Sequence, residues 1–195
     1  MYWWNRFVEF DRKPIDTQLL GGFVLEFSEQ LTLLSPLDDE RFELNGYTVV
    51  RNSDIRRWRT VEEGSFCIRA LNLKGVKPVR RRGLSLVSWP DLLKSANDLF
   101  PLVTISREMI DKNACQIGRI LSMSRVSFEL EEIDTDASWN GHHRYRFSDV
   151  TRVDFGGGYE DALARVAAAN CGAVRTKRRA SANEGEHSLR TKGRE

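Results

Sequence analysis

A pattern of residues in the first half of this chain returns about 95 positions later. The stretch SDIRRW (53–58) reappears as SDVTRV (148–153). The same interval relates Val8 to Val103, Arg12 to Arg107, Ile15-Asp16 to Ile110-Asp111, and Arg51 to Arg146. An interval of 96 relates Gly22, Leu25, Phe27 and Ser28 to Gly118, Leu121, Met123 and Ser124, and a β-bulge produces such a one-residue shift. The sequence therefore predicts a tandem duplication, with units over roughly residues 8–74 and 103–170.

Each unit has the pattern of several short β-strands. VSFEL (126–130) alternates apolar and polar residues, as a half-buried strand does, and LTLL (31–34) is its apolar counterpart. Asn45-Gly46 and Asn140-Gly141 suit loop positions that need a positive φ. Five short strands separated by turns, in about 55 residues, are typical of a small, strongly bent barrel. We expect a mainly β fold with helices (α+β), made of two tandem SH3-like small β-barrels.

Three stretches are predicted to be helical. Each unit ends in one, with apolar faces made of Phe66, Cys67, Ala70 and Leu71 in the first and Tyr159, Leu163, Val166 and Ala167 in the second. Gly75 is placed as a C-cap. A third helix begins in SWPDLL, with Ser88 as N-cap and Pro90 in the first turn, and is expected between the barrels. The predicted divisions are 1–75 (first barrel and helix), 76–101 (basic linker and helix), 102–171 (second barrel and helix) and 172–195 (basic tail).

Composition indicates a globular protein with a basic end. Hydrophobic residues make up 41% and charged residues 30% of the 195 residues. The net charge of +2 conceals a tail from Cys171 onward with seven Lys/Arg and three Glu, which leaves 23 basic and 25 acidic residues in the rest. We expect the tail to be disordered. The three cysteines are widely spaced, which predicts reduced thiols. We find no signal peptide and no apolar run long enough to cross a bilayer, and we therefore expect a cytoplasmic protein that does not bind a membrane.

With these strands in place, each unit resembles an Sm-like barrel, the fold of Sm proteins and of the bacterial Sm-like RNA chaperone. Gly22, Val24, Phe27, Ser28, Leu31, Thr32 and Leu33 fill the family's first motif, and VRNSDI (50–55) and YRFSDV (145–150) fit the second apart from its glycine. The likeness covers about two-thirds of the chain. As a whole the chain also resembles a group of uncharacterised bacterial proteins with a GFVLEFS…LNGYTVVR…DI arrangement, a likeness that implies tandem Sm-like repeats and no function.

The departures from the Sm pattern bear on RNA binding. In Sm proteins an Asp and an Asn of the first motif and an Arg of the second hold a base. Here the first two positions are Ser28 and Thr32, and Ser124 and Phe128 in the second unit, so the amide and carboxylate are missing. Only the arginines, Arg51 and Arg146, persist. Each can bind phosphate, or it can pair with an aspartate three residues later (Asp54 or Asp149).

A second group of basic residues follows the first unit. Together with Trp58 and Trp89 it is of the kind that single-stranded nucleic acid favours, although protein interfaces and solvated linkers use the same residues. The candidate nucleic-acid-binding residues are Arg51, Arg146, Arg56, Arg57, Lys77, Arg80, Arg81 and Arg82.

No catalytic constellation is found in the sequence. His142 and His143 are adjacent, so in a strand they point to opposite faces and cannot chelate one metal. Gly156-Gly157-Gly158 lacks the spacing of a phosphate-binding loop. We therefore expect no enzyme activity, no metal site and no cofactor.

Two functional hypotheses remain. The first is a non-enzymatic binding or scaffold protein whose strand edges and loops contact a protein partner or a second copy. The second is a divergent Sm-like RNA-binding protein using the arginines above.

Overall fold

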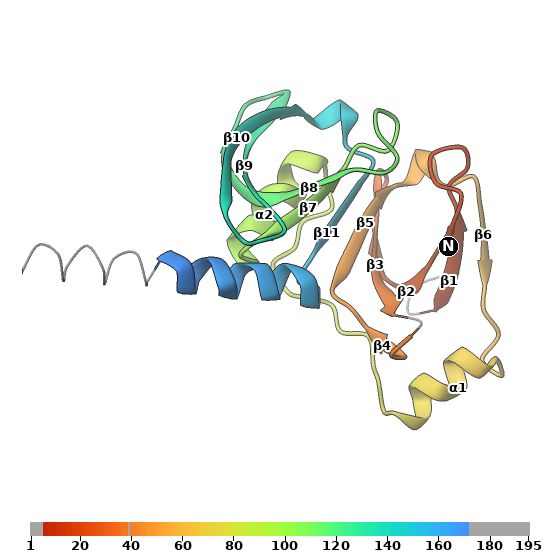
Figure 1. Cartoon of the computed structure of the whole chain (residues 1–195). Coiled ribbons are helices and arrows are strands. Elements are labelled where there is room, and N and C mark those ends of the chain that lie inside the picture. The colour runs from red at the N-terminus through yellow and green to blue at the C-terminus, as the bar shows by residue number, and fades with distance from the viewer. Residues whose placement is uncertain (1–5, 39, 172–195) are drawn as a thin grey trace, which may run out of the picture.

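The computed structural model describes residues 6–38 and 40–171, and these form one antiparallel sheet of 11 strands with three helices. The strand order is β10-β9-β8-β7-β11-β5-β3-β2-β1-β6, with β4 paired to β3. Figure 1 shows the sheet curving strongly twice, once in each half of the chain. The predicted tail, 172–195, lies outside the described residues.

The first half contributes six strands, a 3-10 turn and a helix. They are β1 (Phe7–Asp11), β2 (Leu19–Phe27), β3 (Leu31–Asp38), β4 (Glu43–Leu44), β5 (Tyr47–Arg51), η1 (Asn52–Asp54), β6 (Arg57–Thr60) and α1 (Phe66–Leu73).

The second half repeats this series after a connecting helix, but without a counterpart of β4. Its elements are α2 (Trp89–Leu99), β7 (Val103–Ser106), β8 (Cys115–Met123), β9 (Ser127–Ile133), β10 (Trp139–Arg146), η2 (Phe147–Asp149), β11 (Arg152–Phe155) and a last helix over residues 158–171.

The predicted duplication is present in the strand order. Neighbours run β5-β3-β2-β1-β6 in the first half and β10-β9-β8-β7-β11 in the second. Even the irregularities repeat, because the β2–β3 register shifts between Val24 and Glu26 and the β8–β9 register shifts between Ile120 and Ser122. The glycines of both predicted Asn-Gly turns have positive φ, 70° at Gly46 and 81° at Gly141.

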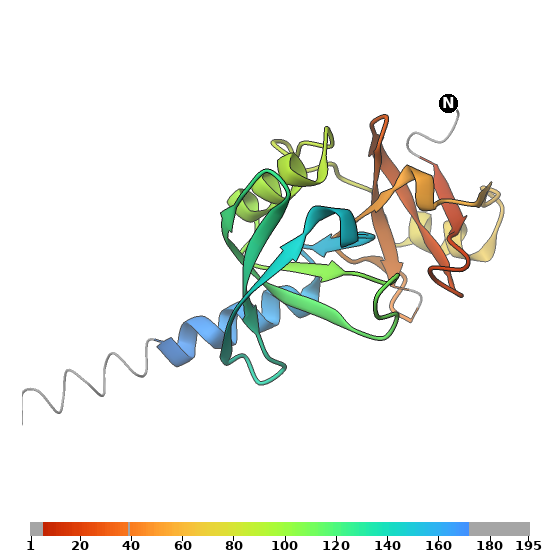
Figure 2. The same ribbon diagram turned by 90° about the horizontal axis from the view of Figure 1, so that it is seen from above.

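The prediction of two closed barrels is wrong. β11, the last strand of the second half, pairs with β7 of its own half and also with β5 of the first half, from Arg152 opposite Val50 to Phe155 opposite Tyr47. We call this β5–β11 pairing the seam. The fold is mainly β, as expected, but the two halves are parts of one open sheet (Figures 1 and 2).

The largest core lies beneath the seam and belongs to both halves. Leu33 and Val49 of the first half pack in one cluster with Val103 and Val153 of the second. Helix α2 contributes Leu92, Leu93 and Ala96, all fully buried, to the same cluster. Ser88 caps this helix, accepting from the N–H of Asp91, and Pro90 lies in its first turn, as predicted. The linker helix thus stabilises the junction of the halves.

The other two helices bury only part of the faces predicted for them. In α1 the buried residues are Ile68 and Leu71, whereas Phe66 is 76% exposed. In the last helix Leu163 and Ala167 are buried, but Tyr159 and Val166 are about half exposed. This helix begins at the seam and runs away from the first half (Figure 1). In the described part of the chain, none of the helices combines the length and apolar character that a membrane crossing requires.

Candidate functional site

Arg51, a predicted nucleic-acid contact, lies in the seam. Its Nη2 donates to the backbone carbonyls of Ser148 (3.2 Å) and Val150 (2.5 Å), both in the second half. The expected ion pair with Asp54 is not formed. Arg51 therefore joins the halves, and its Nη2 is occupied by protein carbonyls.

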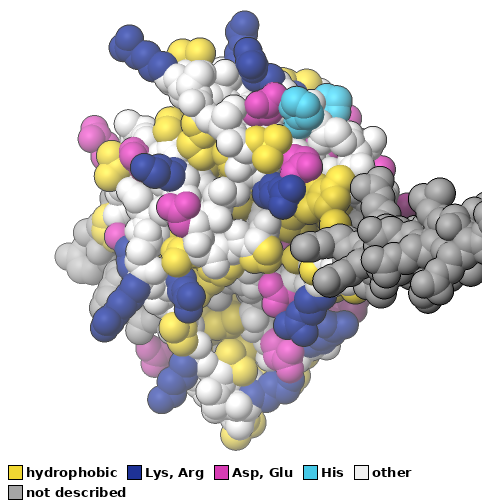
Figure 3. Space-filling model, turned by 90° about the vertical axis from the view of Figure 1, so that its left-hand side faces the viewer, with side chains coloured by type: hydrophobic (Ala, Val, Ile, Leu, Met, Phe, Trp, Pro, Cys, Tyr) yellow, Lys and Arg dark blue, Asp and Glu magenta, His cyan; other side chains and the backbone are white. Residues whose placement is uncertain are grey.

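The other predicted basic residues are exposed and dispersed. Arg146 ends β10 at one border of the sheet, whereas Arg56 and Arg57 lie at β6 on the opposite border. In the linker, Arg80 forms an ion pair with Glu26 of β2, while Lys77, Arg81 and Arg82 are exposed. On the face shown in Figure 3, Lys and Arg side chains are scattered among acidic ones. The structure does not bring these eight residues into one surface.

The residues at the Sm-type base positions serve the local fold. The Oγ of Ser28 accepts from the backbone N–H groups of Gln30 and Leu31 in the β2–β3 turn. Thr32 is buried and donates to the Asn52 side chain at 2.6 Å. Ser124 repeats the turn contacts of Ser28, and Phe128 is 1% exposed in the core.

His142 and His143 are exposed on β10, where His142 Nδ1 is 2.7 Å from Glu129 Oε1. Over the described residues, no group of three His, Cys, Asp or Glu side chains is arranged to hold a metal ion.

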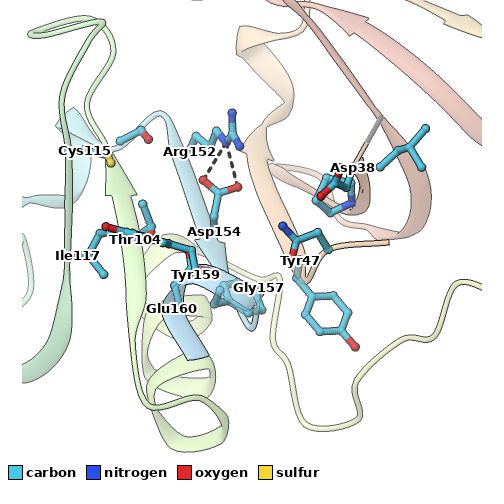
Figure 4. Close-up of a pocket in the computed structure, with 15 residues that line it drawn as sticks. Asp38, Tyr47, Thr104, Cys115, Ile117, Arg152, Asp154, Gly157, Tyr159 and Glu160 are labelled. Atoms are coloured by element: carbon cyan, nitrogen blue, oxygen red, sulfur yellow. Dashed lines mark hydrogen bonds and ion pairs between the residues drawn. The ribbon is translucent and has the colours of Figure 1, made fainter. Parts of the chain in front are cut away.

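A cavity lies at the seam, and we call it the seam cavity. It has a volume of about 510 Å³ and is lined by both halves (Figure 4). The first half supplies Pro36, Leu37, Asp38, Asn45 and Tyr47, and the second half supplies Thr104, Ser106, Cys115, Ile117, Arg152, Asp154, Phe155, Gly157, Tyr159 and Glu160.

An ion pair on β11 forms the floor of the seam cavity. Arg152 Nε lies 2.9 Å from Asp154 Oδ1 and 2.8 Å from Oδ2, and Thr48 of β5 donates to Oδ1 at 2.5 Å. Strand alternation explains this placement, because Val153 and Phe155 point into the core and the alternate residues, Arg152 and Asp154, point the other way. Burial raises the pKa of Asp154 above its ordinary value, with Arg152 opposing the shift and Glu160 adding to it.

Glu160 stands at the start of the last helix, beside the floor. It is 9% exposed, and its Oε1 accepts from Thr104 Oγ1 at 2.7 Å. A carboxylate in the first turn of a helix is stabilised by the helix dipole. Across the seam, Asn45 Oδ1 accepts from the N–H of Gly158 at 2.9 Å, which ties the same helix start to the first half.

A second cavity of about 530 Å³ adjoins the first and shares Ser106, Cys115 and Arg152 with it. Its wall contains Glu108, which forms a buried ion pair with Arg12 of the first half. Arg12 is fully buried, and its Nη1 donates to Glu108 Oε1 at 3.1 Å. The two cavities thus adjoin along the junction of the halves, and we call the pair the depression.

Cys115 opens onto both cavities. Partial burial of the thiol raises its pKa, and the nearby Asp154 carboxylate raises it further. A thiol is nucleophilic as the thiolate, which a raised pKa disfavours. At neutral pH, the Cys115 side chain therefore faces both cavities as a neutral thiol.

Sequence reasoning did not find the seam cavity. β11 shares only its first arginine with its repeat partner β6, because Val153, Asp154 and Phe155 stand where β6 has Trp58, Arg59 and Thr60. Such differences between the two copies are the sequence signal that could have pointed to the seam cavity.

Comparisons of the chain with protein-family models, with curated proteins and with solved structures found no match.

Proposed function

We propose that this chain is a non-enzymatic binding protein that engages a segment of a protein partner in the seam cavity. The observation that carries the proposal is the depression along the junction of the halves, and such junctions are among the places where ligand sites preferentially form. Two adjoining cavities suit an extended peptide segment better than a compact small molecule.

RNA binding is the alternative, and it is less well supported. The seam cavity has three carboxylates against one guanidinium, which repels phosphate. Arg51 is held by carbonyl groups, and the other basic residues are dispersed. If RNA were the ligand, binding of a labelled single-stranded RNA would weaken steeply with salt and fall on Arg56→Ala and Arg57→Ala.

Site-specific photocrosslinking tests the proposal. A variant with Cys67→Ser and Cys171→Ser carries a benzophenone on Cys115, inside the depression. A matched control carries the label on an Asp98→Cys variant, with all three native cysteines replaced, at an exposed position of α2. The proposal predicts a defined protein, identified by mass spectrometry, that is crosslinked only through Cys115 and displaced by excess unlabelled chain. The same adducts from both labels, or none from Cys115, would contradict it.

A further inference from the structure

The charges that line the seam cavity are unbalanced. Asp38, Asp154 and Glu160 face a single cation, Arg152. Arg152 is already paired with Asp154 through both carboxylate oxygens. Among the described residues no ion pair compensates Asp38 or Glu160.

One oxygen of Glu160 is available to a ligand. The residue is nine-tenths buried, and Oε1 is used by Thr104. Oε2 has no hydrogen-bond partner within the described chain. Oε2 is also not enclosed. The described side-chain atoms that are both enclosed and without a partner are Arg12 Nε, Asp54 Oδ2 and Trp89 Nε1. Oε2 is therefore accessible to solvent, and it lies beside Gly157, another lining residue, where an added Cβ would be 2.7 Å from it. A largely desolvated carboxylate of this kind gains most from a cationic donor.

The second cavity has a different charge balance. Lys112 and Arg152 line it with Asp16 and Glu108, and Glu108 is neutralised by Arg12. The depression is therefore negative at the Glu160 end and not at the Lys112 end. A cationic side chain is favoured at the first end alone.

We infer that the seam cavity accepts a lysine or arginine side chain of the partner segment, held by a charge-assisted hydrogen bond to Glu160 Oε2 with Asp38 at the rim. The inference rests on the proposed function and names the chemistry of the partner. Asp38 is suited to the rim because its Oδ1 accepts from the backbone N–H groups of Glu40 and Arg41, which fixes the carboxylate in place.

Fluorescence anisotropy with labelled peptides tests this inference on the full chain. The probes are hexalysine and hexaarginine, which separate the two cations, and hexaglutamate. The wild type is expected to bind at least one basic peptide and not the acidic one. Glu160→Gln keeps the shape and an acceptor for Thr104, and it should weaken binding about tenfold or more. Asp38→Asn should weaken it less.

Asp98→Asn is the matched control, because it removes the same charge from an exposed site on α2 that lines neither cavity. Its affinity should stay within about twofold of wild type, since an exposed charge contributes little. Equal losses in Glu160→Gln and Asp98→Asn, or no binding of either basic peptide, would overturn the inference. A Cys115 crosslink that persists in that case would leave the proposed function standing, so the two failures can be told apart.

Discussion

Arg51 and Arg146 occupy the same position of the repeat and have different surroundings. Arg51 donates to two carbonyls across the seam, whereas Arg146 is exposed at the end of β10. The sequence could show that both arginines recur, but their partners are set by which strand lies next to each. The alternatives considered for Arg51 were phosphate and Asp54, and backbone carbonyls of the other half were not foreseeable from local sequence.

This difference predicts unequal costs of truncation. Arg51→Ala should lower the free energy of unfolding by about 1–3 kcal/mol, because it leaves carbonyls at the seam without their charged donor. Arg146→Ala should change it by less than about 0.5 kcal/mol. Urea unfolding of both variants measures the two values. Equal losses of unfolding free energy in the two variants would contradict a stabilising role of Arg51 at the seam.

The Cys115 thiol provides a prediction on pH. Because burial and Asp154 raise its pKa, alkylation by iodoacetamide should reach half its maximal rate at a higher pH than for an unperturbed thiol. Asp154→Asn removes the second cause and should shift the profile back toward lower pH. The rates are measured in a Cys67→Ser, Cys171→Ser background. A profile at or below that of a small-molecule thiol would show a more open or more cationic setting than the structure has.

At the scale of elements, two equivalent glycines mark close approaches between strands. A Cβ at Gly22 would lie 2.6 Å from the carbonyl oxygen of Ser35, and one at Gly118 would lie 2.0 Å from that of Glu131. Both sites are next to the repeated register shift, which brings β3 or β9 against the glycine.

Gly118→Ala should therefore lower the free energy of unfolding by about 1–3 kcal/mol, as forced overpacking does. Gly64→Ala is the control, because nothing lies within 4 Å of its added Cβ. Chemical denaturation compares the two variants, which share the same change in unfolded-chain entropy. Similar midpoints would contradict the close approach at Gly118.

Strands, turns and helix caps follow from local patterns, which is why sequence reasoning located them. The Asn-Gly turns, the Ser88 cap and Gly75, with φ of 70° after α1, are all present. The buried faces of α1 and the last helix are predicted only in part, because several apolar residues lie around each helix: Leu71, Leu163 and Ala167 are buried, whereas Phe66, Tyr159 and Val166 are exposed. Periodicity permits more than one face there, and tertiary packing selects it.

For the whole molecule, the decisive feature is that the halves share one sheet and one core. Alternation in RVDF (152–155) predicts a strand, but it does not say whether the strand's second edge meets its own half or the other. The prediction of two closed barrels requires the second edge to pair within its own half. The seam cavity exists only because β11 pairs with β5 of the other half. Local sequence patterns therefore could not predict a site built from both halves.

The Arg12–Glu108 pair tests how firmly the halves are joined. Arg12→Ala should lower the free energy of unfolding by about 3–5 kcal/mol, because it leaves a buried carboxylate without its partner. The double variant Arg12→Met, Glu108→Met should recover much of this loss, since neither charge is then stranded. A double-mutant cycle from thermal or urea unfolding measures the coupling, and additive losses would mean that the pair does not act as a unit.

Residue-resolved amide hydrogen exchange tests the seam most directly, because the repeat supplies internal controls. A strand paired on both edges protects consecutive amides, whereas a border strand protects alternate ones. We predict protection at consecutive positions of β5 and β11, and only at alternate positions of their equivalents β10 and β6. Alternate protection in β11 and β5 as well would contradict the single sheet, and with it the cavity that the two halves share.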